Sequence, residues 1–215
     1  MRYTNTLFTM TGFLGGFLIA GTVSGADLQV GDVVPHFKCL DDHGQIWDSR
    51  EHVGKKMLVV YFYRSDFAFC CTRQAARYRD NQRGLTNQNV EVVGVSGDVV
   101  AAHAIFRETH RLNHALLADF EGNVAHTFGV PLGAGGKAMV RDVDGKEIVD
   151  GDGAPITIRR DLTPERWTFV IDRDGRVIYR ETNVSPKKDS EDVLDFLCEW
   201  TAKPPMPIKL PMPAK

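Results

Sequence analysis

The sequence predicts an α/β protein with a central mixed β-sheet flanked by helices and with an inserted β-hairpin. Two continuous apolar runs, MLVVYFY at 57–63 and VEVVGVS at 90–96, have strand length and are typical of strands covered on both faces. Segments with helical spacing alternate with such runs, which favours helices packed on the sheet. The 215 residues are enough for one domain with a sizeable core.

Local signals predict the first elements. In FKCLDDHGQIWD, at 37–48, two short apolar runs flank Asp42-His43-Gly44, which predicts an N-terminal hairpin. After the strand at 57–63 comes a polar and aromatic turn. A helix is expected to begin at the adjacent pair Cys70 and Cys71 and to end near Gly84.

The later elements follow the same alternation. Beyond the strand at 90–96 we expect, in order, a helix at 99–112, a strand at 115–120, a short helix at 122–128, a hairpin of 166–171 with 177–181, and an amphipathic helix at 190–200.

The segment 131–165 interrupts the pattern. Its core, AMVRDVDGKEIVDGDGAPITIRR, predicts an inserted β-hairpin with Asp144-Gly145 in its turn. The run 142–147 resembles a calcium loop only in part, because it lacks a third acidic position and a distant Glu. Turn chemistry is therefore the preferred interpretation, and no metal is expected there.

Both ends of the chain predict segments outside the domain at 27–202. Residues 1–26 have one charge, Arg2, then an apolar run, and small residues at Ser24 and Ala26, as in a cleaved secretory signal peptide. We expect a periplasmic or secreted protein with no stable membrane anchor after cleavage; an uncleaved anchor is the alternative. Residues 203–215 contain five prolines and predict a flexible tail.

Composition excludes several function classes. The formal net charge is −2, so a basic nucleic-acid surface is not expected. Four cysteines without a Cys-x-x-Cys spacing argue against a disulfide scaffold and a zinc site. The seven histidines are scattered and expected at the surface, so we predict no metal site.

The cysteine pair is the candidate chemical centre. A thiol in the first turn of a helix lies near unpaired backbone N–H groups and the positive end of the helix dipole, which favour the nucleophilic thiolate. A nearby arginine would lower the thiol pKa further. From the residues alone, a buried and inert cysteine is the alternative.

Several ordered segments resemble the peroxiredoxins, most closely the bacterioferritin-comigratory (peroxiredoxin Q) branch. The resemblance covers about 29–200, interrupted at 131–165. It implies a thioredoxin-like fold and reduction of hydroperoxides by a cysteine thiolate, with no metal or organic cofactor. The segments are GDVVPHFKCLDDHGQIWDS, YFYRSDFAFCCTRQAARYRDN, VVGVSGD, HALLADFEGNVAHTFGV and RWTFVIDRDGRVIYR.

The resemblance assigns the site residues. The peroxidatic cysteine falls on Cys71 and the active-site arginine on Arg166, whose guanidinium would hold the thiolate and stabilise charge on the leaving oxygen. Gln74 lies one helical turn after Cys71 and would support the pocket, a surface position being the alternative.

Two pocket positions depart from the family pattern Pro-x-x-x-Thr-x-x-Cys. Arg64 stands at the Pro position and Ala68 at the Thr position, so the hydroxyl that would bond the peroxide is absent. Losing one such contact costs on the order of 10²–10³ in rate, so we expect attenuated activity. Ser65 and Thr72 are the candidate substitutes.

The second thiol of the cycle is also in question. Many members of the branch carry it five residues after the first, where this chain has Ala76. Cys39 and Cys198 are expected to be packed as small apolar residues, and a bridge between Cys70 and Cys71 would be strained.

We therefore expect a single-cysteine cycle with a thioredoxin-like or small-thiol reductant, in a monomer or homodimer. The alternative functions are a degenerate redox sensor or binding protein and, ranked last, a thiol–disulfide oxidoreductase.

Overall fold

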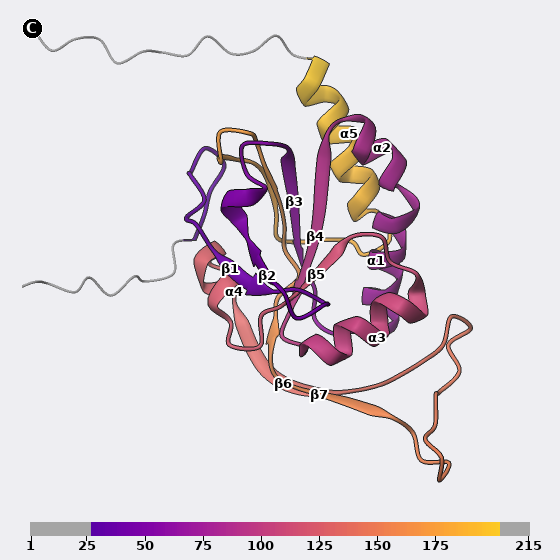
Figure 1. The fold of residues 1–215 in the computed structure, drawn as a ribbon. Coiled ribbons are helices and arrows are strands. Elements are labelled where there is room, and N and C mark those ends of the chain that lie inside the picture. The colour runs from indigo at the N-terminus through magenta and orange to yellow at the C-terminus, as the bar shows by residue number, and fades with distance from the viewer. Residues whose placement is uncertain (1–26, 203–215) are drawn as a thin grey trace, which may run out of the picture.

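A computed structural model describes residues 27–202. The expected signal peptide at 1–26 and the expected tail at 203–215 lie outside the described residues. Figure 1 shows a central sheet with helices on one side, a small N-terminal hairpin and a short helix on the other, and a long two-stranded arm. Among residues 27–202, no helix combines the length and the apolar character needed to cross a membrane.

The mixed sheet has the strand order β5-β4-β3-β8-β9. Strands β3, β4 and β5 run parallel, whereas β8 is antiparallel to β3 and β9 is antiparallel to β8. This confirms the predicted mixed sheet. The strands are β1 (Lys38–Leu40), β2 (Ile46–Asp48), β3 (Met57–Phe62), β4 (Val90–Ser96), β5 (Ala115–Ala118), β6 (Leu132–Met139), β7 (Thr157–Pro164), β8 (Thr168–Ile171) and β9 (Val177–Glu181).

Helices cover both faces of the sheet at the positions that the hydrophobic pattern indicates. They are α1 (Phe69–Asp80), α2 (Gln82–Asn87), α3 (Val100–His110), α4 (Asn123–Phe128) and α5 (Asp189–Ala202), with a 3-10 turn at Ser49–Glu51. Helices α1, α2, α3 and α5 contribute to one core and α4 with the N-terminal hairpin to the other.

Strand β3 is covered by side chains on both faces, which explains the continuous apolar run at 57–63. Val59 and Tyr61 point into the core beneath α1 and α5, whereas Val60 and Phe62 point into the core beneath α4. Because successive side chains of a strand point to opposite faces, a strand covered on both sides needs an apolar residue at every position.

The prediction of a single helix that ends near Gly84 is wrong. The chain bends at Asn81, whose φ and ψ of −87° and 2° separate α1 from α2, and Gly84 lies inside α2. A Cβ at Gly84 would lie 3.3 Å from a methyl of Leu194 on α5. The glycine therefore permits close packing of two helices and does not end one.

Residues 132–164 form the arm. Strands β6 and β7 pair as an antiparallel hairpin, in agreement with the prediction for 131–165. The tip differs, because it contains two tight turns, 142–145 and 150–153, rather than one. In each turn the first aspartate accepts two backbone N–H groups and the glycine has a φ near +82° or +83°. Asp144-Gly145 thus belongs to one of two tip turns.

Two expectations about single residues are also wrong. His103, His110 and His114 are buried, not at the surface. Their rings pack against aromatic side chains of the core, namely Tyr63 for His103, Phe67 and Phe106 for His110, and Tyr61 and Tyr78 for His114. Cys198 is exposed on α5 rather than packed. Cys39 is half-buried, and burial raises the pKa of its thiol to about 12. No cluster of three or more metal-ligating side chains occurs among residues 27–202.

Candidate active site

The two cysteines lie at the start of α1, directly after the loop that leaves the end of β3. Ala68 is the N-cap of the helix and offers no side-chain hydrogen bond to it. Cys71 is the third helical residue and is fully buried, whereas the neighbouring Cys70 is exposed. The expected placement of a thiol in the first helical turn is therefore confirmed, and the helix dipole favours a negative charge there.

Strand pairing brings Arg166 to the thiols. Strand β8 pairs with β3, and the N–H of Phe62 donates to the carbonyl of Trp167, so the residue before it reaches the end of β3 where α1 begins. The Nη2 of Arg166 lies 3.1 Å from Sγ of Cys71 and 3.4 Å from Sγ of Cys70. One guanidinium thus contacts both sulfur atoms.

The two thiols share a single negative charge. The hydrogen bond from Cys71 and the positive charge of Arg166, acting against the effect of burial, together lower the pKa of Cys70 to about 5. The same hydrogen bond and burial raise the pKa of Cys71, although Arg166 opposes this. A thiolate therefore exists at neutral pH beside Arg166, with one proton shared between two adjacent sulfur atoms.

Gln74 fixes the position of Arg166. Its Oε1 accepts a hydrogen bond from Nη1 of Arg166, and its Nε2 donates to the carboxylate of Asp189 at 2.6 Å. The hydroxyls of Tyr78 and Thr168 donate to the same carboxylate at 2.8 and 3.0 Å. Gln74 is fully buried, so the alternative of a surface position is wrong.

Asp189 is a residue that the sequence analysis missed. It is the first residue of α5 and is almost fully buried. Burial raises the pKa of its carboxyl, while its three donors oppose the shift. It lies 115 residues after Gln74, and no local spacing signals such a contact.

Cys70 and Cys71 line a cavity of about 400 Å³, the thiol pocket. One wall is the cysteine loop, 64–68, and the other is the base of the arm. Its lining residues are Arg64, Ser65, Ala68, Cys70, Cys71, Gly133, Ala134, Gly135, Arg160, Thr163 and Glu165. This volume lies within the usual range of pockets that bind small molecules.

The candidate substitutes for the missing hydroxyl behave differently. Ser65 lines the thiol pocket, donates its hydroxyl proton to the carbonyl of Asp66 at 2.8 Å and accepts a hydrogen bond from Arg160. Thr72 lines a neighbouring cleft and is absent from the pocket lining. Arg64 is exposed. Only Ser65 of the two candidates therefore has a hydroxyl at the pocket.

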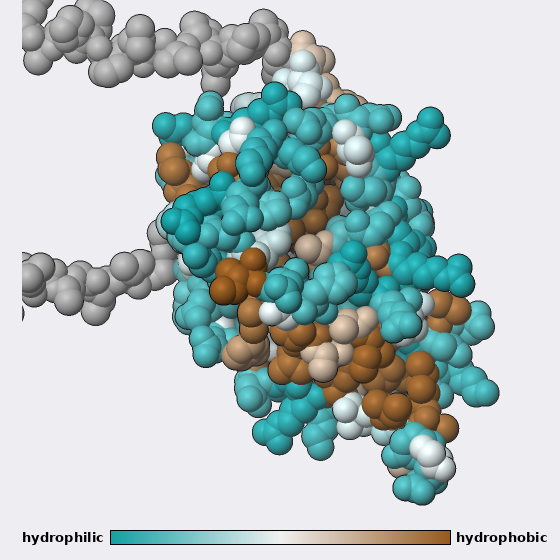
Figure 2. Space-filling model, in the orientation of Figure 1, coloured by the Kyte–Doolittle hydropathy of each residue, from teal (hydrophilic) through white to brown (hydrophobic). Residues whose placement is uncertain are grey.

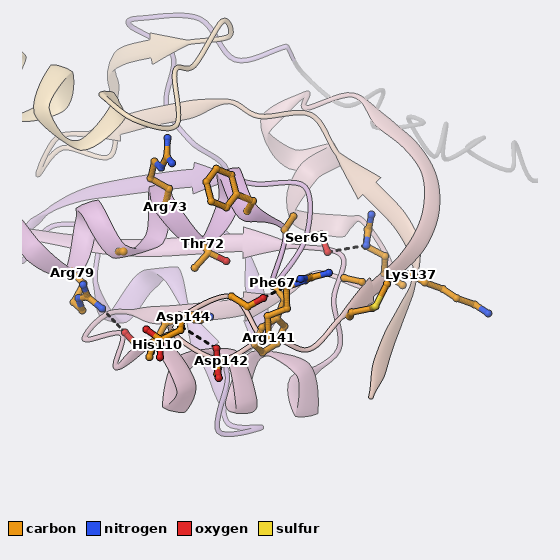
Figure 3. Close-up of a pocket in the computed structure, with 18 residues that line it drawn as sticks. Ser65, Phe67, Thr72, Arg73, Arg79, His110, Lys137, Arg141, Asp142 and Asp144 are labelled. Atoms are coloured by element: carbon orange, nitrogen blue, oxygen red, sulfur yellow. Dashed lines mark hydrogen bonds between the residues drawn. The ribbon is translucent and has the colours of Figure 1, made fainter. Parts of the chain in front are cut away.

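A larger cleft of about 790 Å³ adjoins the pocket between α1 and the arm (Figure 3). Ser65, Ala68 and Arg160 line both cavities, so the pocket continues into the cleft. Figure 3 shows Ser65 at one end of the cleft and Arg79 with His110 at the other. Apolar surface gathers on the lower half of the face shown in Figure 2. Two exposed apolar side chains, Phe69 and Met139, line the cleft.

A buried polar network supports the cysteine loop from below. The carboxylate of Asp66 bonds His103 Nδ1 and the hydroxyl of Tyr63, both at 2.8 Å, and the N–H of Asp66 donates to Asp98 at 2.8 Å. Phe67, next in the loop, has a φ of +57°, a strained conformation for a bulky residue. The network holds this strained loop against the sheet.

Two curated proteins similar to this chain are named as peroxiredoxins. Chloroplastic peroxiredoxin Q of Gentiana triflora is 30% identical over 173 residues, which span 80% of this chain and 68% of that protein. Peroxiredoxin Bcp of Bacillus subtilis is 28% identical over 176 residues, which span 82% of this chain and 99% of that protein.

Solved structures agree with the fold and the family. The crystal structure of peroxidoxin BcpB from Mycobacterium tuberculosis matches with a TM-score of 0.64 and 26% identity, covering 80% of this chain and 97% of that one. These relatives confirm the predicted thioredoxin-like fold and the predicted branch. Residues 30–180 match the AhpC/TSA family, and the chain therefore belongs to this family of peroxiredoxins.

Proposed function

We propose that Cys71 is the sulfur with which this thiol-dependent peroxidase attacks hydroperoxides, and that Arg166 stabilises the reacting charge. One observation carries the proposal: a single guanidinium lies within 3.1 Å of Cys71 at the start of a helix. Two fixed positive groups, the guanidinium and the helix end, thus act on the thiol pair, and the guanidinium is nearer to Cys71. No metal or organic cofactor takes part.

The first step is a displacement at oxygen. The thiolate of Cys71 attacks one oxygen of the peroxide, an S–O bond forms and the O–O bond breaks. The sulfur is oxidised to a sulfenic acid, and the peroxide is reduced to an alcohol or water after the leaving oxygen takes a proton. Arg166 supports this step because its positive charge, 3.1 Å from Sγ of Cys71, stabilises negative charge that develops beside that sulfur.

The second step uses thiols from outside the chain. A thioredoxin-like or small-thiol reductant attacks the sulfenic sulfur, forming a mixed disulfide and water, and a second thiol releases Cys71 with formation of an external disulfide. This single-cysteine cycle is supported by the lining of the thiol pocket, which contains Cys70 and Cys71 but neither Cys39 nor Cys198.

We propose that the rate is attenuated relative to relatives that carry the Thr hydroxyl. Ala68 lines the thiol pocket and presents only a methyl group there, and Arg64 is exposed at the expected Pro position. A lost preorganised contact lowers a rate by on the order of 10²–10³.

We also propose export, on the basis of the small residues and the apolar run at 1–26. The mass of the mature protein recovered from the periplasm or medium tests this. Cleavage after Ala26 is expected, and retention of all 26 residues in a membrane fraction contradicts it.

The cysteine assignment is tested by stopped-flow measurement of the first step with hydrogen peroxide and cumene hydroperoxide. Cys71→Ser is expected to abolish peroxide consumption, and Cys70→Ser is the matched control because it alters the adjacent thiol. Dimedone, which labels sulfenic acids, should mark Cys71. If Cys71→Ser consumes peroxide as fast as the wild type, the assignment is wrong. Dimedone labelling without turnover would instead favour a redox sensor.

A further inference from the structure

Arg160 is a second arginine at the thiol pocket. It lies on β7 of the arm and lines the same cavity as Cys71 and Ala68. It also lines the adjoining cleft, so it stands where the pocket opens toward the rest of a bound molecule. Arg160 is only partly exposed.

Two hydroxyl groups fix the guanidinium of Arg160. Its Nη1 donates to Ser65 Oγ at 2.8 Å, and its Nε donates to Thr163 Oγ1 at 2.9 Å. Both acceptors are buried, with 2% and 7% exposure. A guanidinium held by buried neutral groups keeps its orientation and its full positive charge.

Within residues 27–202 no ion pair neutralises the charge of Arg160, although Glu165 lines the same pocket. Among residues 27–202, no carboxylate lies within ion-pair distance of it, whereas its neighbour Arg159 pairs with Asp161 at 3.6 Å on the surface. Of the five N–H groups of the guanidinium, one on Nη1 and both on Nη2 have no hydrogen-bond partner among residues 27–202. Arg160 therefore retains its charge and free N–H groups, one on Nη1 beside Ser65 of the thiol pocket and two on Nη2 beside Gly136.

The glycines of β6 make room for this arrangement. A Cβ at Gly136 would lie 3.0 Å from Nη2 of Arg160, and a Cβ at Gly135 would lie 2.2 Å from its carbonyl oxygen. Any side chain at these positions would push the guanidinium or the strand aside. The arm thus has local features that permit the observed place of Arg160.

We propose that Arg160 contacts the bound hydroperoxide and supplies the hydrogen-bond donor that Ala68 lacks. Its free N–H would bond the peroxide oxygen next to the alkyl group, while Arg166 holds the sulfur. The alkyl group would extend past Arg160 into the cleft. The arm then completes the catalytic pocket, and this inference rests on the proposed peroxidase function.

Arg160 does not change the bonds formed and broken at Cys71. Arg160 exchanges no electrons and stays protonated, because its guanidinium does not lose its proton in proteins. It stabilises the negative charge on the leaving oxygen until solvent supplies a proton. Its contribution is therefore to the rate of the first step and not to the identity of the products.

Three variants test the inference in the full chain. Arg160→Met removes the donors with a similar side-chain length, Arg160→Lys keeps the charge, and Arg159→Met is the matched control on the adjacent residue. With hydrogen peroxide, stopped flow should show a loss of on the order of 10²-fold for Arg160→Met, a smaller loss for Arg160→Lys and no change for Arg159→Met.

A second readout separates contact with the peroxide from an effect on the thiolate. Alkylation by iodoacetamide, which is neutral and contains no peroxide, is measured on the same variants. If Arg160 contacts the peroxide, Arg160→Met lowers the peroxide rate at least tenfold more than the alkylation rate. Equal losses in both rates, or no loss of the peroxide rate, overturn the inference.

A double variant tests whether the loss of peroxide rate in Arg160→Met comes only from unfolding of the arm. Adding Ala68→Thr to Arg160→Met restores a donor to the pocket, so the peroxide rate should rise more in this background than in the wild type. An equal rise in both backgrounds overturns the inference. Absence of peroxide reduction by the wild type overturns the proposed function and this inference together, whereas a wild-type rate retained by Arg160→Met overturns the inference alone.

Discussion

Gln74 on α1 donates a hydrogen bond to the buried carboxylate of Asp189 on α5, at 2.6 Å and across 115 residues of sequence. The same amide accepts from Arg166, so the position of the guanidinium at the thiols depends on a carboxylate that does not contact them. The helix pair α1 and α5 thereby fixes the geometry of the site.

Gln74→Leu is expected to weaken both the fold and the site. Asp189 loses one of three donors while buried, which costs about 1–3 kcal/mol in the free energy of unfolding. Arg166 loses its acceptor, so the alkylation rate of the thiols falls as well. Urea denaturation and iodoacetamide kinetics measure the two effects.

Arg77→Leu is the control for this change. Arg77 lies on the same helix, and its 3.7 Å ion pair with Glu191 is at the surface, where such pairs contribute little. A Gln74→Leu variant with the stability and alkylation rate of Arg77→Leu would contradict the supporting role of Gln74.

Ala68→Thr is expected to stabilise the helix and to raise the rate. Ala68 is the N-cap of α1 with extended φ and ψ of −67° and 129° and makes no side-chain cap bond. A Thr hydroxyl at an N-cap contributes about 1 kcal/mol and would also face the thiol pocket. Thermal denaturation and stopped flow with hydrogen peroxide measure the two gains.

Ala68→Val is the matched control, because it has nearly the shape of Thr without the hydroxyl. Val is expected to give neither gain. Equal rates for the Thr and Val variants would show that the missing hydroxyl does not limit this pocket, and the proposal of attenuation would fail.

The strands and their order of appearance could be predicted from the sequence because their signal is local. Val59 and Val60 face opposite cores, and an uninterrupted apolar run is the direct mark of that situation. Gly84 misled the prediction because a glycine that ends a helix and one that allows close packing look the same in sequence.

The site was only partly predictable. The contact of Arg166 with Cys71 followed from the resemblance to a family and not from spacing, since 95 residues separate them. His103, Asp189 and Arg160 act through contacts made only in the folded chain, so their types and neighbours in sequence did not distinguish them from surface residues. Burial distinguishes His103 and Asp189 from surface residues, and burial depends on the whole fold.

The hydrogen bond between the thiols predicts different titrations for two variants of Cys71. The bond from Cys71 is the largest cause of the low pKa of Cys70, near 5. Cys71→Ala removes the donor, so the pKa of Cys70 should rise and its thiolate fraction at pH 6 should fall. Cys71→Ser keeps a hydroxyl donor, so the pKa should stay low.

Alkylation of Cys70 followed by mass spectrometry from pH 4 to 9 measures these pKa values. The wild-type rate should fall as the pH drops through about 5, where the thiolate takes up a proton. The midpoint of Cys71→Ala should lie above that of Cys71→Ser. Coincident midpoints would mean that Arg166 and the helix end, rather than the neighbouring thiol, set the charge.

Asp98, beneath the cysteine loop, makes the fold sensitive to pH. Burial and the nearby Asp66 raise the pKa of Asp98 to about 6, from 3.8 in an unperturbed carboxyl. Between pH 3.8 and about pH 6, the Asp98 carboxyl is therefore protonated in the folded state and ionised in the unfolded state. The contribution of Asp98 to stability is full below about pH 4 and is lost as the pH rises through about 6.

Asp98→Asn removes this titration while keeping an acceptor for the N–H of Asp66. We expect the free energy of unfolding to decline less between pH 4.5 and 7.5 than in the wild type, with a difference of about 1–3 kcal/mol. Urea denaturation at both pH values measures it, and Asp174→Asn, at an exposed turn, is the control. If Asp98→Asn and Asp174→Asn decline equally, the charge on Asp98 does not destabilise the fold, and its carboxylate is compensated by the network around His103.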